Sequence, residues 1–224
     1  MKKIIVLILL LNASLLHSQE LIRPNFAMAS HPIVLQKIRV TQDQLIINLS
    51  IENKVSGGNF CIDKDTYILD VLNRIKRTMV SSKNIPNCPE AYHFKRIGEK
   101  LNFELYFPLP QSDLKYLNLV EDCDANCLSL LGIILIPEMN HQIEKAFEAF
   151  DDGKYQQSEN ILTNTIKEYS DYPFGFLHLN LIQVLLVQEK IKKAREYLRV
   201  IKSSSFYDKN SILEQLKKYE ELKN

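Results

Sequence analysis

The period of the hydrophobic residues changes once along this chain, close to Pro137. Before this proline, apolar and polar residues alternate, as in "QLIINLSI" (44–51) and "KLNFELYF" (100–107). A period of two predicts strands that bury one face. After the proline, apolar residues recur every three or four positions, which predicts amphipathic helices. The two patterns do not mix, so the sequence predicts a β part that is followed by an α part.

The β part consists of short apolar runs separated by turn signals such as "SGGN" and "IPNCPE". The runs recur at spacings of roughly 8 to 12 residues without a helical crossover, which is typical of an antiparallel β-sandwich of immunoglobulin type. Trp is absent, so the Cys…Trp…Cys core of antibody domains is not available. We predict an immunoglobulin-like antiparallel β-sandwich domain over residues 19–137. The candidate strands are "IVLQKIRV" (33–40), "QLIINLSI" (44–51), "NFCID" (59–63), "TYILDV" (66–71), "IKRTMVS" (75–81), "AYHFKRI" (91–97), "KLNFELYF" (100–107), "KYLNLVE" (115–121) and "CLSLLGIILI" (127–136).

The α part, residues 138–224, repeats a helical hairpin. A helix that ends near Asp151 is followed by a "DDGK" turn, a second helix to about Tyr169 and a stop at "DYP". The pattern then recurs, and "DKNSILEQLKKYEELKN" supplies a last helix with a polar outer face. This self-match predicts stacked helical hairpins. At an offset of 36, the matched pairs are Gly153 with Glu189, Tyr155 with Ile191, Ser158 with Ala194, and Leu162 with Leu198.

This spacing resembles the tetratricopeptide repeat, whose hairpins carry small residues where helices cross and aromatic residues between them. The unit is nearer 36 than 34 residues, and Pro173 falls about three places late in the repeat. Only two units are visible, where about three are needed for a stable stack. We therefore expect a short tetratricopeptide-like α-hairpin stack that packs against the sandwich or against a partner. Its last helix should cap the stack. The positions that fit the repeat are Ala146, Gly153, Tyr155, Ser158, Ala194 and Leu198.

The β part resembles small secreted immunoglobulin-like modules of Bacteroidetes-type bacteria. The resemblance covers about 75 residues, from "DTYILD" at 65–70 to "EDCDANCLSLLGI" at 121–133. Between these two segments lie "IPNCP" at 85–89 and "GEKLNFELYFPLP" at 98–110. The resemblance implies a binding or scaffolding domain associated with export, and it brings no catalytic residues with it.

Residues 1–18 predict a cleaved secretory signal. Two lysines precede an apolar run at 4–11, and polar and small residues follow it up to Ser18. Gln19 would then be the first mature residue, and the alternative is an uncleaved N-terminal anchor. After Ser18, the longest strongly apolar stretch is "CLSLLGIILIP", well short of the ~20 residues of a membrane helix. We expect an exported protein, periplasmic or extracellular, with no membrane span after signal cleavage.

Four cysteines, an even number, predict disulfides in an exported chain. Three pairings are possible. Local reach favours Cys123 with Cys127, because a turn can hold two Cα atoms this close in sequence at disulfide distance. Cys61 with Cys88 then follows by elimination. The alternatives, a zinc site or a redox centre, fit less well, because only one pair has the ligand spacing of zinc and the C-x-x-C spacing of redox centres is missing.

Patterns that carry other chemistry are weak. The chain has 28 basic and 27 acidic residues, without the basic excess that nucleic acids require. It lacks a phosphate-binding glycine loop and a G-x-S-x-G elbow. The segments "EAYH" (90–93) and "EMNH" (138–141) have the Glu-x-x-His spacing of di-iron bundles, but too few helices for such a site. We predict no catalytic residues, no cofactor and no metal.

The leading hypothesis is a non-catalytic secreted or periplasmic protein that binds or scaffolds a protein or peptide partner. The face expected to be concave is mostly apolar, so its occupant would be a hydrophobic segment or the protein's own sandwich. Ordinary core packing between the hairpins is the alternative interpretation of this face. Its predicted residues are Ile143, Phe147, Phe150, Phe176, Leu179, Gln183 and Leu186.

A second hypothesis is a glycan-binding accessory β-sandwich module. Such modules use exposed aromatic platforms, although the absence of Trp counts against this function. A hydrolase whose residues meet only in the fold is a third hypothesis. The residues that could form a glycan platform are Tyr67, Tyr92, Tyr106 and Tyr116.

Overall fold

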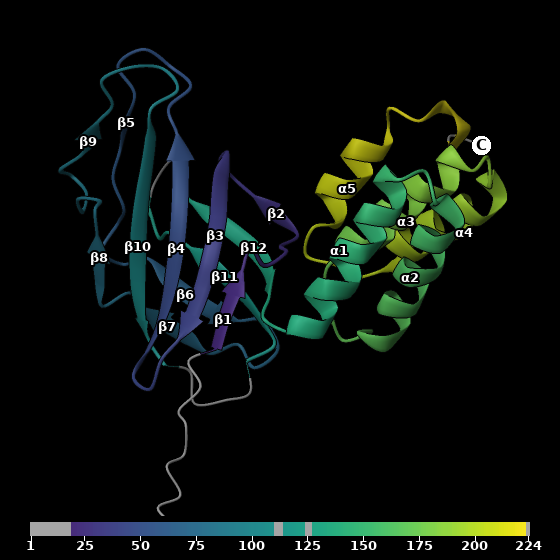
Figure 1. The fold of residues 1–224 in the computed structure, drawn as a ribbon, viewed down its shortest axis with the longest axis horizontal. Coiled ribbons are helices and arrows are strands. Elements are labelled where there is room, and N and C mark those ends of the chain that lie inside the picture. Colours follow the sequence, from purple (N-terminus) through teal and green to yellow (C-terminus); the bar gives the residue numbers. More distant parts are fainter. Residues whose placement is uncertain (1–18, 110–113, 124–126, 223–224) are drawn as a thin grey trace, which may run out of the picture.

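The computed structural model describes residues 19–109, 114–123 and 127–222. These residues form twelve strands, followed by five α-helices and one short 3-10 helix (Figure 1). The β-then-α layout expected from the sequence is confirmed. The predicted signal at 1–18 and the centre of the "CDANC" loop at 124–126 lie outside the described residues. None of the helices in the described part of the chain is long and apolar enough to cross a bilayer.

The strands form two five-stranded antiparallel sheets and one two-stranded ribbon. Sheet A consists, in spatial order, of β1 (Gln19–Ile22), β3 (Ile33–Val40), β4 (Gln44–Glu52), β10 (Lys100–Pro108) and β8 (Ser81–Lys83). Sheet B consists of β2 (Met28–Ala29), β12 (Ser129–Ile134), β11 (Tyr116–Val120), β6 (Tyr67–Asp70) and β7 (Lys76–Thr78). The ribbon pairs β5 (Asn59–Phe60) with β9 (Tyr92–His93).

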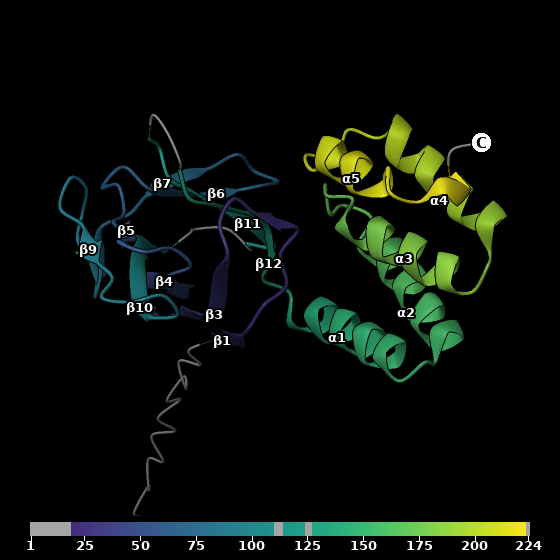
Figure 2. The ribbon, with the colours of Figure 1, turned by 90° about the horizontal axis from the view of Figure 1, so that it is seen from above.

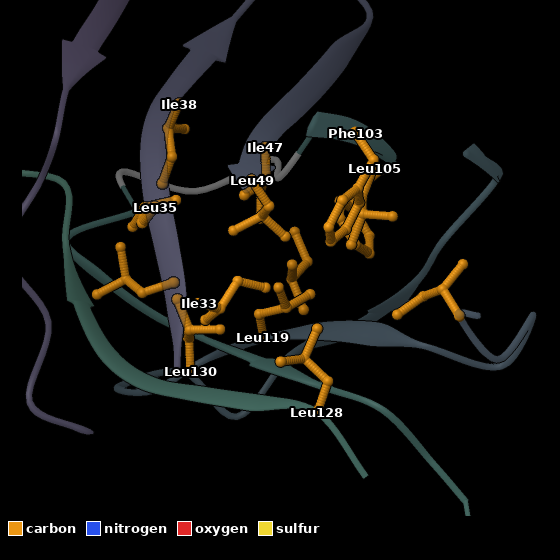
Figure 3. Packing of buried hydrophobic residues seen from close by; sticks show 14 of the residues in the cluster. Ile33, Leu35, Ile38, Ile47, Leu49, Phe103, Leu105, Leu119, Leu128 and Leu130 are labelled. Carbon is orange, nitrogen blue, oxygen red and sulfur yellow. The ribbon is translucent and has the colours of Figure 1, made fainter. Parts of the chain in front are cut away.

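Sheets A and B pack face to face around one apolar core (Figure 3). Ile47 and Leu49 of β4 and Phe103 and Leu105 of β10 point inward from sheet A, and each is at most 1% exposed. They meet side chains of sheet B such as Leu119. Burying a side chain of this size contributes about 1.5–3 kcal/mol. The alternation read from the sequence therefore marks the residues that hold the two sheets together.

Sheet B is covered on both faces. Leu117 and Ile133 belong to the core between the sheets, whereas Tyr116 and Ile134 belong to a second core that they share with the helices. All four side chains are fully buried. A strand buried on both faces needs apolar residues at nearly every position. This explains why the segment that contains β12 is the longest apolar run after residue 18.

The helices are α1 (Pro137–Asp151), α2 (Tyr155–Glu168), α3 (Phe176–Val187), α4 (Ile191–Ser203), α5 (Lys209–Leu216) and the 3-10 helix η1 (Glu220–Leu222). The α1–α2 and α3–α4 turns are equivalent at the offset of 36. Gly153 and Glu189 both have positive φ, 74° and 59°. The next amides, of Lys154 and Lys190, donate to the carbonyls of Ala149 and Leu185. Two hairpins of the same build therefore follow one another, as the internal match predicts.

The β part differs from the sequence prediction in several places. The runs predicted as strands at 59–63 and 91–97 pair only at 59–60 and 92–93, as a separate ribbon. Strands β1 and β2 were not predicted, because neither short segment has an alternating pattern. The run predicted as one strand at 75–81 is divided between the sheets. The Met79 amide donates to the Thr66 carbonyl beside sheet B, whereas the Val80 amide donates to the Tyr106 carbonyl of sheet A. The chain therefore crosses between the sheets within this run.

Candidate functional site

The predicted concave face lies along the seam between α1 and α3. Ile143 is fully buried and Leu179 is 8% exposed, and both belong to the helical core. Phe147 and Phe176 contact each other edge to face, with ring centroids 6.3 Å apart. The other members of this face are half-buried: Phe150, Gln183 and Leu186. Only part of the predicted set is therefore accessible, as a strip along the seam.

The sandwich reaches the helices at one end of the hairpins, beginning with Asn140 in the first turn of α1. The Asn140 Oδ1 accepts hydrogen bonds from the Asn25 amide at 2.7 Å and from its side-chain nitrogen at 3.0 Å. The Asn140 Nδ2 donates to the carbonyls of Ile134 and Ile136, at 2.9 and 3.1 Å. One buried amide thus ties α1 to the chain before β2 and to the end of β12. No sequence pattern marks Asn140, because three of the four hydrogen bonds of its side chain are to main-chain groups and the fourth is to the side chain of Asn25, 115 residues away.

The next contact is made by Tyr172, in the loop between α2 and α3. Its hydroxyl donates to the carbonyl of Gly132 at 2.6 Å. Gly132 lies in a β-bulge of β12, with φ of 70°, and its amide donates to the Asn118 Oδ1 at 2.7 Å. A Cβ at this position would come within 2.8–2.9 Å of Tyr172, Phe174 and Ala27. The bulge and the missing side chain therefore let the loop approach the sheet.

A carboxylate and a second tyrosine strengthen this contact. Asp171 accepts hydrogen bonds from the Tyr116 hydroxyl and from the Lys115 ammonium, each at 2.9 Å. Burial, with the hydrogen bond to Asp171, raises the pKa of Tyr116 well above its usual range. Partial burial would raise the pKa of Asp171, but the bonds from Lys115 and Tyr116 outweigh it and lower this pKa. Asp171 is thus an ionised acceptor beside a protonated phenol.

The last contact lies beyond α4. Arg74, in the turn between β6 and β7, donates to the Tyr207 hydroxyl at 2.7 Å. Successive segments of the helical part therefore contact successive strands of sheet B (Figure 2). Helix α1 contacts β12, the α2–α3 loop contacts β12 and β11, and the α4–α5 loop contacts the β6–β7 turn. The hairpin turns at 152–154 and 188–190 lie at the other ends of the helices. The helical part thus rests with one edge across sheet B.

A cleft of about 830 Å³ lies at the end of the two sheets where β4 and β11 finish and β3 begins. The structure forms disulfides between Cys61 and Cys88 and between Cys123 and Cys127, the two pairs expected from the sequence. Three of these cysteines line the cleft. The lining residues are His31, Pro32, Ile51, Glu52, Asn53, Lys54, Val55, Gly58, Asn59, Phe60, Cys61, Asp63, Cys88, Phe94, Glu121 and Cys123.

Glu121 joins two walls of this cleft. Its Oε1 accepts from the Asp63 amide and its Oε2 from the Leu128 amide, both at 2.7 Å, and the residue is 8% exposed. The carboxylate therefore connects the loop after β5 to the chain that enters β12. On the opposite wall, the Asn53 side chain donates to the Arg96 carbonyl at 2.9 Å. Nothing in the sequence around Glu121 predicts that its carboxylate joins these two segments.

The side chains of the cleft are partly apolar and partly charged. Phe60, Phe94 and Val55 offer apolar surface, and Val55 is 61% exposed. The charged residues Glu52 and Lys54 at its rim pair with each other. Across the described residues, no three His, Cys, Asp or Glu side chains are grouped so as to hold a metal ion.

The tyrosines considered for glycan binding are not brought together. Tyr67 lies on sheet B with the Lys76 ammonium 3.8 Å from its ring centre. Tyr92 lies on the β5–β9 ribbon, and Tyr106 lies on sheet A, where its hydroxyl donates to Glu104. Tyr116 is fully buried beneath the helices. They do not form a shared platform.

No protein-family model matches this chain, and no curated protein or solved structure matches it either. The immunoglobulin-like and tetratricopeptide-like resemblances stay predictions.

Proposed function

We propose that this protein is an exported, non-catalytic interaction protein that binds a protein or peptide partner. In this proposal an immunoglobulin-like sandwich carries the binding site, and a short tetratricopeptide-like stack braces the sandwich. Two disulfides are typical of proteins that fold in an oxidising compartment outside the cytosol. The contacts across sheet B favour a bracing role for the helices, because they cover its outer face.

The observation that carries the proposal is the cleft framed by the disulfides. Its volume of about 830 Å³ falls within the ~300–1,000 Å³ usual for binding sites. The Cys61–Cys88 bond and the Glu121 carboxylate fix its walls before any partner arrives. A preformed site loses less conformational entropy on binding, which favours affinity. The partner should insert an apolar side chain toward Phe60 and Phe94 and pair its main chain with the polar rim.

The glycan-binding alternative gains no support, because the four tyrosines lie in separate places. A glycan array with the purified protein is nevertheless a simple companion experiment. If the protein binds a specific oligosaccharide and a substitution in the cleft abolishes this binding, the ligand of the cleft would be a glycan rather than a protein.

The proposal is tested by site-specific photo-crosslinking in the exporting host. A benzophenone amino acid is placed at Val55 in the cleft, at Val200 on α4 as an exposed control, and at Gln183 on the α1–α3 seam. We expect one discrete adduct from Val55 and none from Val200, with the partner identified by mass spectrometry. An adduct from Gln183 but not from Val55 would move the site to the helical face. Equal labelling from Val55 and Val200 would refute the cleft as a specific site.

A further inference from the structure

The cleft at the end of the sandwich has an unbalanced charge. Its lining includes three acidic residues, Glu52, Asp63 and Glu121, and one basic residue, Lys54. At the rim, Glu52 pairs with both Lys54 and Lys100, so its charge is compensated. Neither Asp63 nor Glu121 forms a salt bridge with any residue that the structure describes. The cleft therefore contains two carboxylates that no cation compensates.

These two carboxylates belong to the same wall of the cleft. The Glu121 Oε1 accepts from the Asp63 amide at 2.7 Å, so the two residues are in direct contact. Glu121 is 8% exposed, and backbone amides bind both of its oxygens. It therefore acts on a ligand through its charge, which solvent screens less than the charge of an exposed group.

Asp63 provides the oxygen that a ligand can reach. Its Oδ1 accepts from the Asp65 amide at 2.7 Å. Its Oδ2 has no hydrogen-bond partner in the part of the chain that the structure describes, and this atom is accessible to solvent. Lys64 and Asp65, which follow Asp63, are exposed, do not line the cleft and have opposite charges. The free oxygen can therefore accept a charge-assisted hydrogen bond from a cation in the cleft.

The rest of the lining favours one kind of cation. Phe60, Phe94 and Val55 give the cleft apolar and aromatic surface. A guanidinium group suits aromatic surface beside a carboxylate better than an ammonium group, because it stacks on rings and is more weakly hydrated. Among the described residues, no group of three His, Cys, Asp or Glu side chains could hold a metal ion, which also favours an organic cation.

We propose that the partner of the cleft presents an arginine beside an apolar residue. The guanidinium binds Asp63, and the apolar side chain packs against Phe60 and Phe94. This inference rests on the proposed function, because it concerns the same cleft and names the class of segment that the cleft selects. The charge of Glu121 adds to the selection, since a cleft with one sign of charge concentrates ligands of the opposite sign.

Three peptides test this chemistry on a chain of residues 19–224. The probes are acetylated and amidated Gly-Phe-Arg-Gly and its versions with citrulline or glutamate in place of arginine. Citrulline keeps the length and planar end of arginine without its charge. We expect the arginine peptide to bind about tenfold more tightly than the citrulline peptide, and the glutamate peptide to bind most weakly. Titrations monitored by NMR give the affinities, and the amide resonances of Phe60 and Asp63 locate the site.

Two variants, each first checked for an unchanged melting temperature, assign the preference to one carboxylate. Asp63→Asn removes the charge and keeps an acceptor for the Asp65 amide, so it should abolish the preference for arginine over citrulline. Asp65→Asn is the matched control, because Asp65 does not line the cleft, and it should retain the preference. Glu121→Gln is unsuitable, because its amide group would turn a donor toward a backbone amide.

Photo-crosslinking from Val55 in the exporting host separates this inference from the proposed function. We expect Asp63→Asn to lower the yield of the Val55 adduct about tenfold and Asp65→Asn to leave it unchanged. An adduct whose yield is unchanged in Asp63→Asn would overturn the arginine and keep the cleft as a binding site, whereas the absence of any adduct would overturn both. Equal affinity of wild-type protein for the arginine and citrulline peptides, or no binding of either at millimolar concentration, would also overturn the inference.

Discussion

The approach of the helices to sheet B depends on one residue without a side chain. At Gly132 the backbone has φ of 70°, and atoms of Ala27, just before β2, and of the α2–α3 loop lie within 2.8–2.9 Å of the position that a Cβ would take. Both conditions select glycine, the first through backbone sterics and the second through close packing. The pairing of its amide with Asn118 and its carbonyl with Tyr172 leaves no main-chain group of this residue without a partner.

We predict that Gly132→Ala destabilises the protein by about 3 kcal/mol, combining the cost of a positive φ with overpacking. Gly153→Ala is the matched control, because φ is 74° there and nothing lies within 4 Å of the added Cβ. That variant should lose only about 1 kcal/mol. Urea unfolding followed by circular dichroism measures both. Equal losses of stability in the two variants would mean that the close packing at Gly132 does not contribute to the cost of the substitution.

Glu159 is a buried carboxylate that should contribute to the pH dependence of stability in acid. Its carboxylate is 4% exposed and accepts from Lys190 at 2.6 Å, Lys193 at 2.5 Å and Gln188 at 3.0 Å. Burial alone would raise the pKa of Glu159, but these hydrogen bonds outweigh it and lower the pKa from 4.5 to about 2. The two lysines belong to the second hairpin, so this group joins the two hairpins.

Because the folded pKa lies below the unfolded one, the unfolded state takes up the proton first as the pH falls. The stabilisation is complete above pH 4.5 and is lost as the pH falls toward 2. The difference corresponds to about 3 kcal/mol. Glu159→Gln should therefore lose less stability than wild type between pH 5 and pH 2.5, as measured by chemical unfolding at each pH. Parallel pH profiles for the two proteins would contradict this assignment.

At the scale of elements, periodicity was most informative where an element has one buried face. Strand β3 matches its predicted run, β4 and β10 extend theirs by one residue, and α1 and α2 end within a residue of the positions predicted from the sequence. Strand β12 was predicted, but not that both its faces are buried, because a single sequence does not say what covers an apolar run. The short strands β1 and β2 carry no periodic signal, since pairing with β3 and β12 defines them.

The candidate site was only partly predictable for the same reason. The cysteine pairs followed from count and spacing, which are local properties. The cleft that they frame did not, because it gathers chain segments from residue 31 to residue 123. Asn140 and Glu121 bind main-chain groups, and such partners leave no trace in a sequence. The predicted seam between α1 and α3 includes core residues, since apolar periodicity alone does not separate a groove from a core.

The disulfides differ in the length of chain that they close. The Cys61–Cys88 bond joins residues 27 apart, and the Cys123–Cys127 bond joins residues 4 apart. Loop-closure entropy predicts stabilisation of about 3.6 and about 2 kcal/mol respectively. Replacing Cys61 and Cys88 together with Ser should therefore lower the unfolding midpoint more than replacing the other pair. Non-reducing peptide mapping of the exported protein verifies the pairing first. A larger loss for the Cys123 and Cys127 variant would contradict the ring-size argument.

At the scale of the whole molecule, the two parts differ in how complete their cores are. The core between the sheets consists of residues from the β part alone. The helical core takes Val71, Tyr116 and Ile134 from the sandwich. Sheet B thus serves as a wall for the helices, which compensates for a stack of only two hairpins.

A chain of residues 19–224 should therefore unfold in one calorimetric transition. A fragment of residues 19–136 should keep a cooperative transition of its own, whereas a fragment of residues 137–224 should melt without one, because its core lacks a wall. Differential scanning calorimetry of the three proteins checks this. Two resolved transitions in the full chain, or cooperative melting of the helical fragment, would show that the helices fold without the sheet.

Because successive helical segments contact successive strands of sheet B, the width of the sheet bears on how many hairpins it can support. Five strands give four spacings of about 4.8 Å, so the sheet is about 19 Å wide. The contacts of α1, the α2–α3 loop and the α4–α5 loop already extend from β12 to the β6–β7 turn, so two hairpins use most of this width. A third complete hairpin would extend past β7 with no strand beneath it, so the width of the sheet limits the number of hairpins. A longer helical stack would therefore require a sheet B with more strands.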